Sequence, residues 1–395
     1  MSSSSLKSLA AFFCVLIQIS CGPEGSLGDD VRSEIDTLGG VVYVRNSGVA
    51  PRSELSPVLR IGSVAGGPAE FGRVRSVVAD RDGVVYVADN LSSEVRVFGS
   101  DGSHLNTIGR RGEGPGEFGD LYSLAWLGRD LVVMDPRNVR IGRFSTDGEW
   151  LEGIRYYPIS GPATFIRLHP LADDGFYAPV LARGYDRLPF VRFSTAGPVD
   201  TIVAPASPVG ARTYGLRCDR PDGGIQFISI PEAPSTVFSF PPEGGHIAIA
   251  WTELYLIAVV GAEGDTIRVI ERDQDPVPYP DELWREALEP YEEMRTQFPG
   301  TRCEPEAPER PPHRAALRTI LFDDAGRMWA EVATIDGFAW EVFDQSGTVV
   351  TRANAPARQP DIPPYVRGSQ LYQVEVDSMD VQYVGVYRLE LLERQ

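Results

Sequence analysis

One short motif occurs twice in the chain, and its spacing constrains the fold more than any other feature. The segment GPAEF at residues 67–71 returns as GPGEF at residues 114–118, 47 residues later. Strand-like segments and Asp-Gly turns follow each copy in the same order. A unit of roughly 40 to 50 residues with four short strands is typical of a β-propeller blade. The sequence therefore predicts a ring of such blades.

The rest of the chain continues this pattern. Strand-like segments mark a third blade from Phe165, a fourth at residues 247–270 and a fifth at 318–347, whereas residues 371–389 supply one strand too few for a sixth. We expect Val41 to Val44 to pair there as the missing outer strand, because closure leaves no open sheet edge. The predicted fold is all-β: a six-bladed β-propeller of four-stranded blades, with one short helical insert between blades 4 and 5.

These segments resemble the NHL-type six-bladed β-propeller proteins of bacteria, and most closely a group of six-bladed β-propeller lipoproteins. The resemblance rests on Asn46-Ser47-Gly48 and on the glycine-rich linker at residues 112–118, and it covers residues 39–391. It implies that the linker glutamate and phenylalanine pack the blades, and that Asp89 and Asp135 stabilise turns. It implies no particular reaction, because propellers host many unrelated functions.

The N terminus has the features of an export signal. An apolar run at residues 9–17 follows Lys7 and is too short to span a membrane. Residues 19–22 resemble a bacterial lipoprotein cleavage box, which implies lipidation of Cys21. We expect a location in the bacterial cell envelope, lipid-anchored or otherwise periplasmic or secreted. The expected divisions are a signal peptide at residues 1–20, a flexible tether at 21–38 and the propeller at 39–391.

The cysteines agree with export. Cys14 would leave with the signal peptide and Cys21 would carry the lipid, so Cys218 and Cys303 remain as a pair. An even number of cysteines in an oxidising compartment favours a disulfide. We therefore predict a bond between Cys218 and Cys303.

Charge limits the classes of partner. The formal net charge is −18, and nearly all the basic residues are arginines. Such an acidic chain is a poor match for nucleic acid or for an anionic membrane surface. We expect membrane contact only through an N-terminal lipid, and a monomer.

A proline-flanked segment from about residue 273 to 312 interrupts the repeat. Five apolar residues in it recur at helical spacing: Trp284, Ala287, Leu288, Tyr291 and Met294. This spacing predicts an amphipathic helix, capped by Asp281 and kinked or split at Pro290. Two roles remain open: a helix packed on the propeller rim, or a lid in which Trp284 and Tyr291 cover one mouth of the central channel.

No catalytic or metal-binding set emerges from the sequence. His169 lies on a predicted inner strand near the channel, but one histidine does not make a zinc site. The repeated acidic pairs, such as Asp323-Asp324, occupy the same hairpin of successive blades and are explained by turn chemistry. We therefore expect no cofactor; the alternative is a divalent metal in the channel, as in the sugar-lactonase relatives of this fold.

Two functional hypotheses follow. The first is a non-enzymatic, extracytoplasmic binding module that presents loops and a channel mouth to a protein, peptide or glycan partner. The second is a metal-dependent hydrolase or lyase with its site in the central channel. The sequence favours the first and does not identify the partner.

Overall fold

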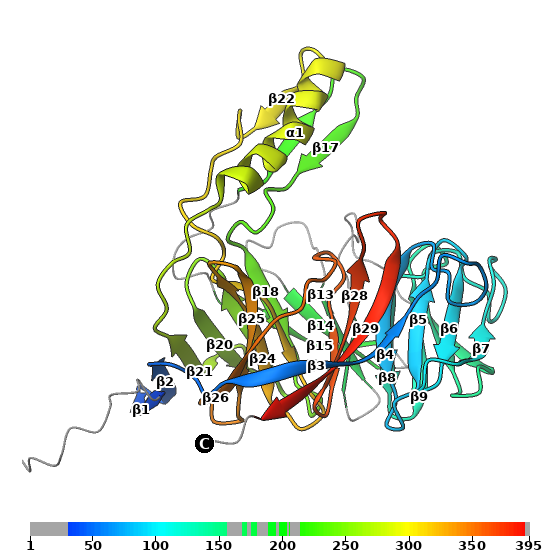
Figure 1. Ribbon diagram of the computed structural model, residues 1–395, viewed down its shortest axis with the longest axis horizontal. Helices are drawn as coiled ribbons and strands as arrows, with labels where there is room; N and C mark the ends of the chain where they lie inside the picture. Colours follow the sequence, from blue (N-terminus) through cyan, green and yellow to red (C-terminus); the bar gives the residue numbers. More distant parts are fainter. Residues whose placement is uncertain are drawn as a thin grey trace, which may run out of the picture.

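The computed structural model of the chain describes residues 31–155, 168–171, 175–179, 189–194, 197–203, 205 and 214–391. These residues form seven β-sheets and one helix, α1 (Asp281–Gln297). Six sheets stand side by side as blades, and the seventh projects from them together with α1 (Figure 1). Among the described residues, the first strands of most neighbouring blades contact one another, so these strands form the inner wall of a ring.

Each blade contains four antiparallel strands, and their order in the sheet goes from the axis of the ring to its rim. Blade 1 consists of β4 (Val74–Ala79), β5 (Val85–Asp89), β6 (Glu94–Phe98) and β7 (His104–Ile108). Blade 2 consists of β8 (Ser123–Leu127), β9 (Asp130–Asp135), β10 (Arg140–Phe144) and β11 (Trp150–Arg155). Blade 3 consists of β12 (His169–Pro170), β13 (Phe176–Pro179), β14 (Pro189–Ser194) and β15 (Gly197–Val203). Blade 4 consists of β18 (Thr236–Ser239), β19 (His246–Trp251), β20 (Leu256–Gly261) and β21 (Thr266–Arg272). Blade 5 consists of β23 (Leu317–Phe322), β24 (Met328–Thr334), β25 (Gly337–Phe343) and β26 (Val349–Asn354). Blade 6 consists of β27 (Tyr365–Arg367), β28 (Gln370–Val376), β29 (Gln382–Leu391) and β3 (Ser53–Ile61).

An N-terminal strand closes the ring, but it is not the expected one. The outer strand of blade 6 is β3, which pairs antiparallel with β29. The prediction that Val41 to Val44 fill this place was wrong. Pro57 makes β3 an unpromising strand by sequence, yet an outer strand tolerates proline because one of its edges needs no partner. A bulge opposite Val386 and Tyr387 accommodates the local irregularity.

The segment containing Val41 instead extends blade 4. β2 (Val41–Ser47) pairs in parallel with β21, and β1 (Arg32–Leu38) pairs with β2, giving a six-stranded sheet. Residues 32–38 are therefore a strand and not part of a flexible tether. Gly39 and Gly40 make the tight turn between β1 and β2 with φ values of 60° and 87°, a region that favours glycine.

Asn46 explains the Asn-Ser-Gly motif at the start of the propeller. Its side chain is buried, donates to the carbonyl of Gly347 at 3.0 Å and accepts from the amide of Val349 at 3.0 Å. Both partners belong to the outer hairpin of blade 5. The motif thus fixes β2, on blade 4, to the neighbouring blade.

Apolar side chains between neighbouring blades make the core. The middle strands are buried on both faces, as β5 is at every residue, because each blade packs between two others. Trp329 and Trp340 are fully buried between blades 5 and 6, with ring centroids 6.1 Å apart at an edge-to-face angle. These contacts fix the ring that carries the loops.

The regular strand order gives the ring two different faces. In every blade the first strand starts, and the fourth strand ends, on the same side. We call this side the linker face, because the linkers between blades (residues 109–122 and 355–364, for example) cross it. The turns between second and third strands lie there too. The opposite side, the hairpin face, carries the other two turns of each blade.

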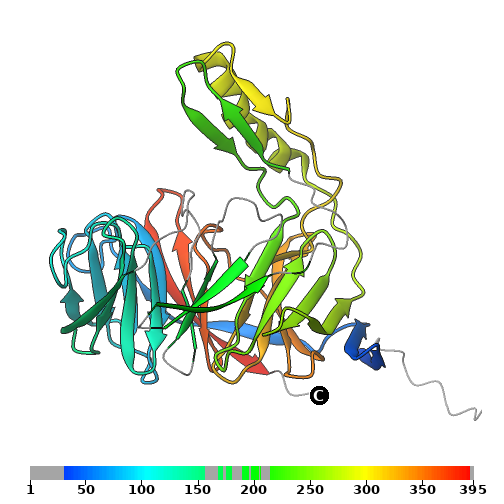
Figure 2. The same ribbon diagram turned by 180° about the vertical axis from the view of Figure 1, so that it is seen from behind.

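Two of these linkers build a separate projection from the linker face. The strands β16 (Leu216–Asp219), β17 (Ile225–Ile228) and β22 (Arg302–Glu304) form a three-stranded sheet, and α1 packs on it. We call these four elements the appendage. Figure 2 shows it standing clear of the blades. The insert between blades 4 and 5 is therefore confirmed, but it shares its sheet with the linker between blades 3 and 4.

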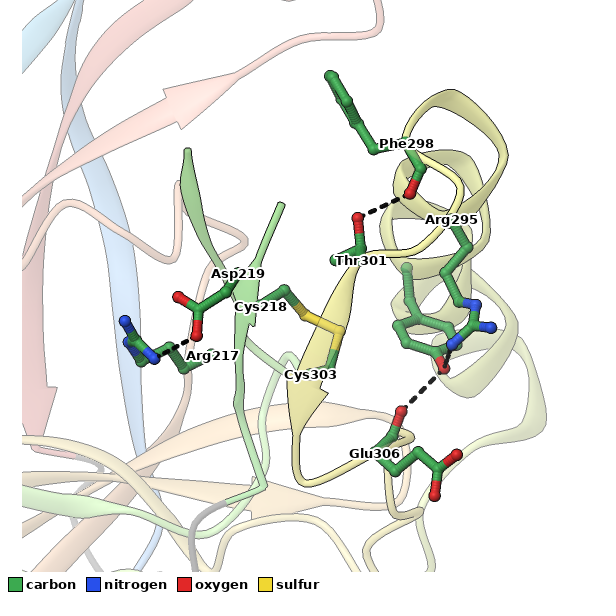
Figure 3. Close-up of a disulfide and its surroundings, with 9 residues drawn as sticks. Arg217, Cys218, Asp219, Arg295, Phe298, Thr301, Cys303 and Glu306 are labelled. Atoms are coloured by element: carbon green, nitrogen blue, oxygen red, sulfur yellow. Dashed lines mark hydrogen bonds and ion pairs between the residues drawn. A yellow bond between two sulfur atoms is a disulfide. The ribbon is translucent and has the colours of Figure 1, made fainter. Parts of the chain in front are cut away.

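The predicted disulfide joins the two linkers. Cys218 on β16 and Cys303 on β22 are opposite each other in the sheet, bonded, with Cα atoms 4.0 Å apart (Figure 3). Cys218 lies in the appendage, in the linker between blades 3 and 4. The bond therefore fastens the appendage's sheet together.

The helix differs in two details from its prediction. Pro280 and not Asp281 is the N-terminal capping residue, and no side chain caps the first turn. Asp281 is instead the first helical residue and pairs with Arg310 at 2.6 Å. α1 also continues through Pro290 unsplit, because packing against the sheet compensates for the missing backbone donor.

Candidate functional site

The linker face exposes apolar side chains at the tips of its turns. Four of the five described turns between second and third strands carry a large apolar residue that is exposed to solvent: Leu91 (60%), Leu254 (41%), Ile335 (86%) and Met379 (71%). In the corresponding turn of blade 2 the exposed residue is Arg137. Because these residues occupy equivalent turns of one face, they make that face a candidate interaction surface.

A polar pocket opens on the same face between blades 1 and 2. It has a volume of about 320 Å³ and is lined by Arg73, Asn90, Leu91, Arg111, Gly119, Asp120 and Arg137. All of these residues come from linkers or from turns between second and third strands. The pocket therefore belongs to the linker face.

Asn90 organises the pocket wall. This side chain is buried; its oxygen accepts from Arg73, and its amide nitrogen donates to Asp120 and to the carbonyl of Leu121, the latter at 2.9 Å. Arg111 donates from Nη2 to the carbonyl of Leu91 at 3.0 Å. Two of the three guanidinium groups are thus held in place by neutral acceptors.

The backbone beneath the pocket is held by the two predicted turn aspartates. Asp89 accepts from the amides of Gly72 and Arg73 at 2.9 Å each, and Asp135 accepts from those of Gly119 and Asp120 at 3.0 and 2.9 Å. Their role in stabilising the linker turns is confirmed. Because these carboxylates are engaged with backbone donors, they do not enter the pocket.

A buried glutamate anchors the linker between blades 5 and 6. Glu331 is fully buried; Arg358 donates to it from Nη2 at 2.6 Å and Arg318 from Nε at 2.9 Å. Nη1 of Arg358 also donates to three linker carbonyls, those of Gln359, Pro360 and Ile362. Burial alone would raise the pKa of Glu331, but the two arginines outweigh it and hold this pKa below its ordinary value of 4.5.

A second buried glutamate ties blade 4 to blade 5 beneath the appendage. Glu341 accepts from Arg272 at 3.2 Å, from Arg352 at 3.1 Å and from the hydroxyl of Tyr255 at 2.8 Å. Burial, and next the nearby Glu341 carboxylate, raise the pKa of Tyr255 well above its ordinary value. At the base of the appendage, Arg314 of one linker pairs with Glu232 of the other at 2.6 Å and donates to the carbonyl of Thr334 in blade 5 at 2.9 Å.

Trp284 and Tyr291, the candidate lid residues, lie inside the appendage. Trp284 packs in a cluster with Tyr214 and Ile230, and Tyr291 in one with Leu216. The Tyr291 hydroxyl also donates to the carbonyl of Glu306 at 3.0 Å. Their apolar face is therefore turned toward the small sheet, a third arrangement besides the rim and the channel mouth.

His169 lies in an aromatic cluster between blades 3 and 4. Its ring centroid is 4.9 Å from that of Phe240 and 5.6 Å from that of Phe238.

Asp323 accepts hydrogen bonds from the backbone amides of Ala325 and Arg327, as expected for a turn residue. In the described part of the chain, no three His, Cys, Asp or Glu side chains gather as metal ligands. Cys21 and the signal peptide lie outside the described residues.

Sequence reasoning missed the pocket, although the repeat contains its signal. Arg73 and Asp120 occupy equivalent places in blades 1 and 2, and so do Leu91 and Arg137, each the second residue of the turn between second and third strands. Residues that only pack a blade should keep their type between repeats, whereas here the type changes and the side chains stay at least partly exposed. That contrast could have identified the site.

Comparison with known proteins supports the architecture. A family model described as a 6-bladed beta-propeller matches residues 69–161. No curated protein sequence matches the chain. None of the helices in the described residues is long and apolar enough to cross a membrane.

Two of the similar solved structures illustrate the range of neighbours. A member of the duf4221 family from Bacteroides vulgatus is 9% identical over 92% of this chain and 99% of its own, with a TM-score of 0.48. A gluconolactonase from Xanthomonas campestris is 13% identical over 86% of this chain and 99% of its own, with a TM-score of 0.39. Six blades around one ring and the family match over blades 1 and 2 identify the chain as a six-bladed β-propeller protein.

Proposed function

We propose that the chain is an exported, non-enzymatic binding module whose linker face docks a partner protein. The observation that carries this proposal is the set of aliphatic turn tips on that face, with Ile335 exposed to 86%. Apolar side chains on a rigid ring bind with little loss of conformational freedom, because the scaffold already holds them in place.

Charge divides the linker face and adds to its specificity. The exposed side of α1 carries six acidic residues (Asp281, Glu282, Glu286, Glu289, Glu292 and Glu293) and two arginines (Arg285 and Arg295). The arginine-lined pocket lies on the opposite side of the ring, over blades 1 and 2. A partner that spans the face would therefore present a basic region to α1 and an acidic one to the pocket, which favours a single orientation.

Site-specific photo-cross-linking tests the docking face. A photoreactive amino acid at Ile335 should form a discrete adduct with the partner in cells that produce the protein. The same residue at Ala325, on the hairpin face of the same blade, should form none. Equal adducts at both positions, or an adduct only at Ala325, would refute docking through the linker face.

A competition experiment shows whether the adduct reflects specific binding of the partner and not merely the exposure of Ile335. Excess unmodified wild-type protein should suppress the Ile335 adduct, because it occupies the partner. An Ile335→Asp/Met379→Asp protein should compete poorly, since charged tips lose the apolar contact. Full competition by this variant would show that the aliphatic tips are not part of the interface.

We further propose that Cys21 is lipidated after export, on the basis of the cleavage-box resemblance at residues 19–22. Radiolabelled palmitate fed to producing cells should enter the wild-type protein and not Cys21→Ala. Export should survive the substitution if the apolar run at residues 9–17 still directs secretion. Equal labelling of both proteins would exclude this cysteine as the anchor.

A further inference from the structure

Three guanidinium groups, those of Arg73, Arg111 and Arg137, line the pocket, and none of them forms an ion pair in the described part of the chain. Elsewhere in the structure arginines commonly pair with carboxylates, as Arg143 does with Asp130 at 2.6 Å. A positive cluster of this kind is unusual in a chain of net charge −18.

The pocket's own carboxylate leaves this excess in place. Asp120 is the one acidic residue in the lining, and it accepts a hydrogen bond from the buried amide of Asn90. Asp89 and Asp135 beneath the pocket are paired with Arg96 and Arg140, so three guanidinium groups against one carboxylate leave the lining with an excess of positive charge. Guanidinium groups match the planar and tetrahedral oxygens of carboxylate and phosphate better than other side chains do.

From this geometry we propose that the pocket between blades 1 and 2 binds a small, multiply charged oxyanion, as a free ligand or as a group on a larger molecule. The volume of about 320 Å³ suits a ligand of a few heavy atoms with its hydration, at the lower end of ligand pockets. Arg73 and Arg111 are pre-oriented by the oxygens of Asn90 and Leu91, so that binding does not have to order them. The proposal does not depend on docking of a partner protein.

Calorimetric titration of the full mature chain tests the site directly. Inorganic phosphate and citrate are the two probes, at low ionic strength, with sodium chloride at matched ionic strength as the blank. Saturable one-site binding of phosphate, of citrate or of both supports the site and distinguishes a phosphate ligand from a polycarboxylate. If neither probe binds saturably, the proposal is wrong.

Arginine variants locate the binding. Arg111→Gln and Arg137→Gln should each weaken the probe that binds by about tenfold, since a lost charge-assisted contact amounts to about one decade in Kd. Arg81→Gln and Arg129→Gln are the matched controls, because both lie in exposed hairpins on the opposite face of the same two blades. A similar loss in the controls, or none at Arg111 and Arg137, would overturn the assignment.

Asp120→Asn gives a result of opposite sign. Asparagine keeps an oxygen for the hydrogen bond from Asn90 and removes only the negative charge. Binding of the anionic probe should tighten by about threefold to fivefold, as expected for removing a like charge a few ångströms away in water. Weaker binding would mean that Asp120 contacts the ligand as an acceptor, which contradicts a simple oxyanion site.

Discussion

Replacing Glu331 with glutamine is expected to lower the free energy of unfolding by about 3 to 5 kcal/mol at neutral pH. Glutamine keeps the shape of the side chain but leaves Arg358, whose side chain is 1% exposed, without its counter-charge. Arg318, 16% exposed, loses the same partner. Urea unfolding followed by the fluorescence of the buried Trp329 and Trp340 measures the change.

The size of this effect should depend on pH in a defined direction. The folded pKa of Glu331 is lower than its ordinary value of 4.5, so its stabilising contribution is present above that pH and is lost as the pH falls through the folded pKa. The difference between wild type and Glu331→Gln should therefore be constant near neutrality and shrink in acid. A difference that grows on acidification would contradict the assigned direction.

Glu271→Gln is the matched control. Glu271 also pairs with an arginine, Arg45, at 3.2 Å, but both side chains are about half exposed. An exposed pair contributes between zero and about 1 kcal/mol, so this variant should be nearly as stable as wild type. If Glu331→Gln were no more destabilised than Glu271→Gln, the linker between blades 5 and 6 would not depend on the buried cluster.

Which parts of the fold could be predicted depends on the range of the interactions that determine them. The repeat at residues 67–71 and 114–118, the buried middle strands and the helical spacing of Trp284 and Tyr291 are local patterns, and they predicted the blades and the helix. Ring closure was predicted in kind but assigned to the wrong strand. The local sequence favours β2 over β3, which contains Pro57, but the choice is made by partners more than 200 residues away, at Ile270 and Val384.

The appendage and the pocket could not be predicted for the same reason. The sheet of the appendage pairs a strand that contains Cys218 with one that contains Cys303, and these strands lie in different linkers. Neither linker alone has a sequence pattern that predicts this pairing. The pocket joins Asn90 and Arg111, whose meeting depends on the packing of blade 1 against blade 2. The even number of remaining cysteines predicted the disulfide but not the sheet in which it lies. Exposed side chains assembled by tertiary packing carry the candidate site, whereas the sequence most clearly predicts the buried scaffold.

Removal of the disulfide should also have a large effect. The bond closes a loop of 85 residues, for which the chain-entropy account gives a stabilisation of about 4 kcal/mol. That loop contains strands β18 to β21 of blade 4 as well as α1, so its closure restricts the unfolded chain well beyond the appendage. Cys218→Ala/Cys303→Ala should accordingly lower the free energy of unfolding of the whole ring, measured in urea, by up to about this amount.

Hydrogen exchange separates this global effect from a local one. In the folded state the disulfide also joins β16 to the three-residue strand β22, which has few other contacts to hold it. In the double variant, amides of β22 and α1 should exchange faster relative to those of β5 and β9 than in wild type, and wild type treated with reductant should behave like the variant. Unchanged stability together with unchanged exchange in β22 would mean that packing of Met294 and Tyr291 on the small sheet holds the appendage without the bond. Faster exchange in the appendage at unchanged global stability would instead mean that the disulfide stabilises only the appendage. The appendage would then be the least stable part of the molecule.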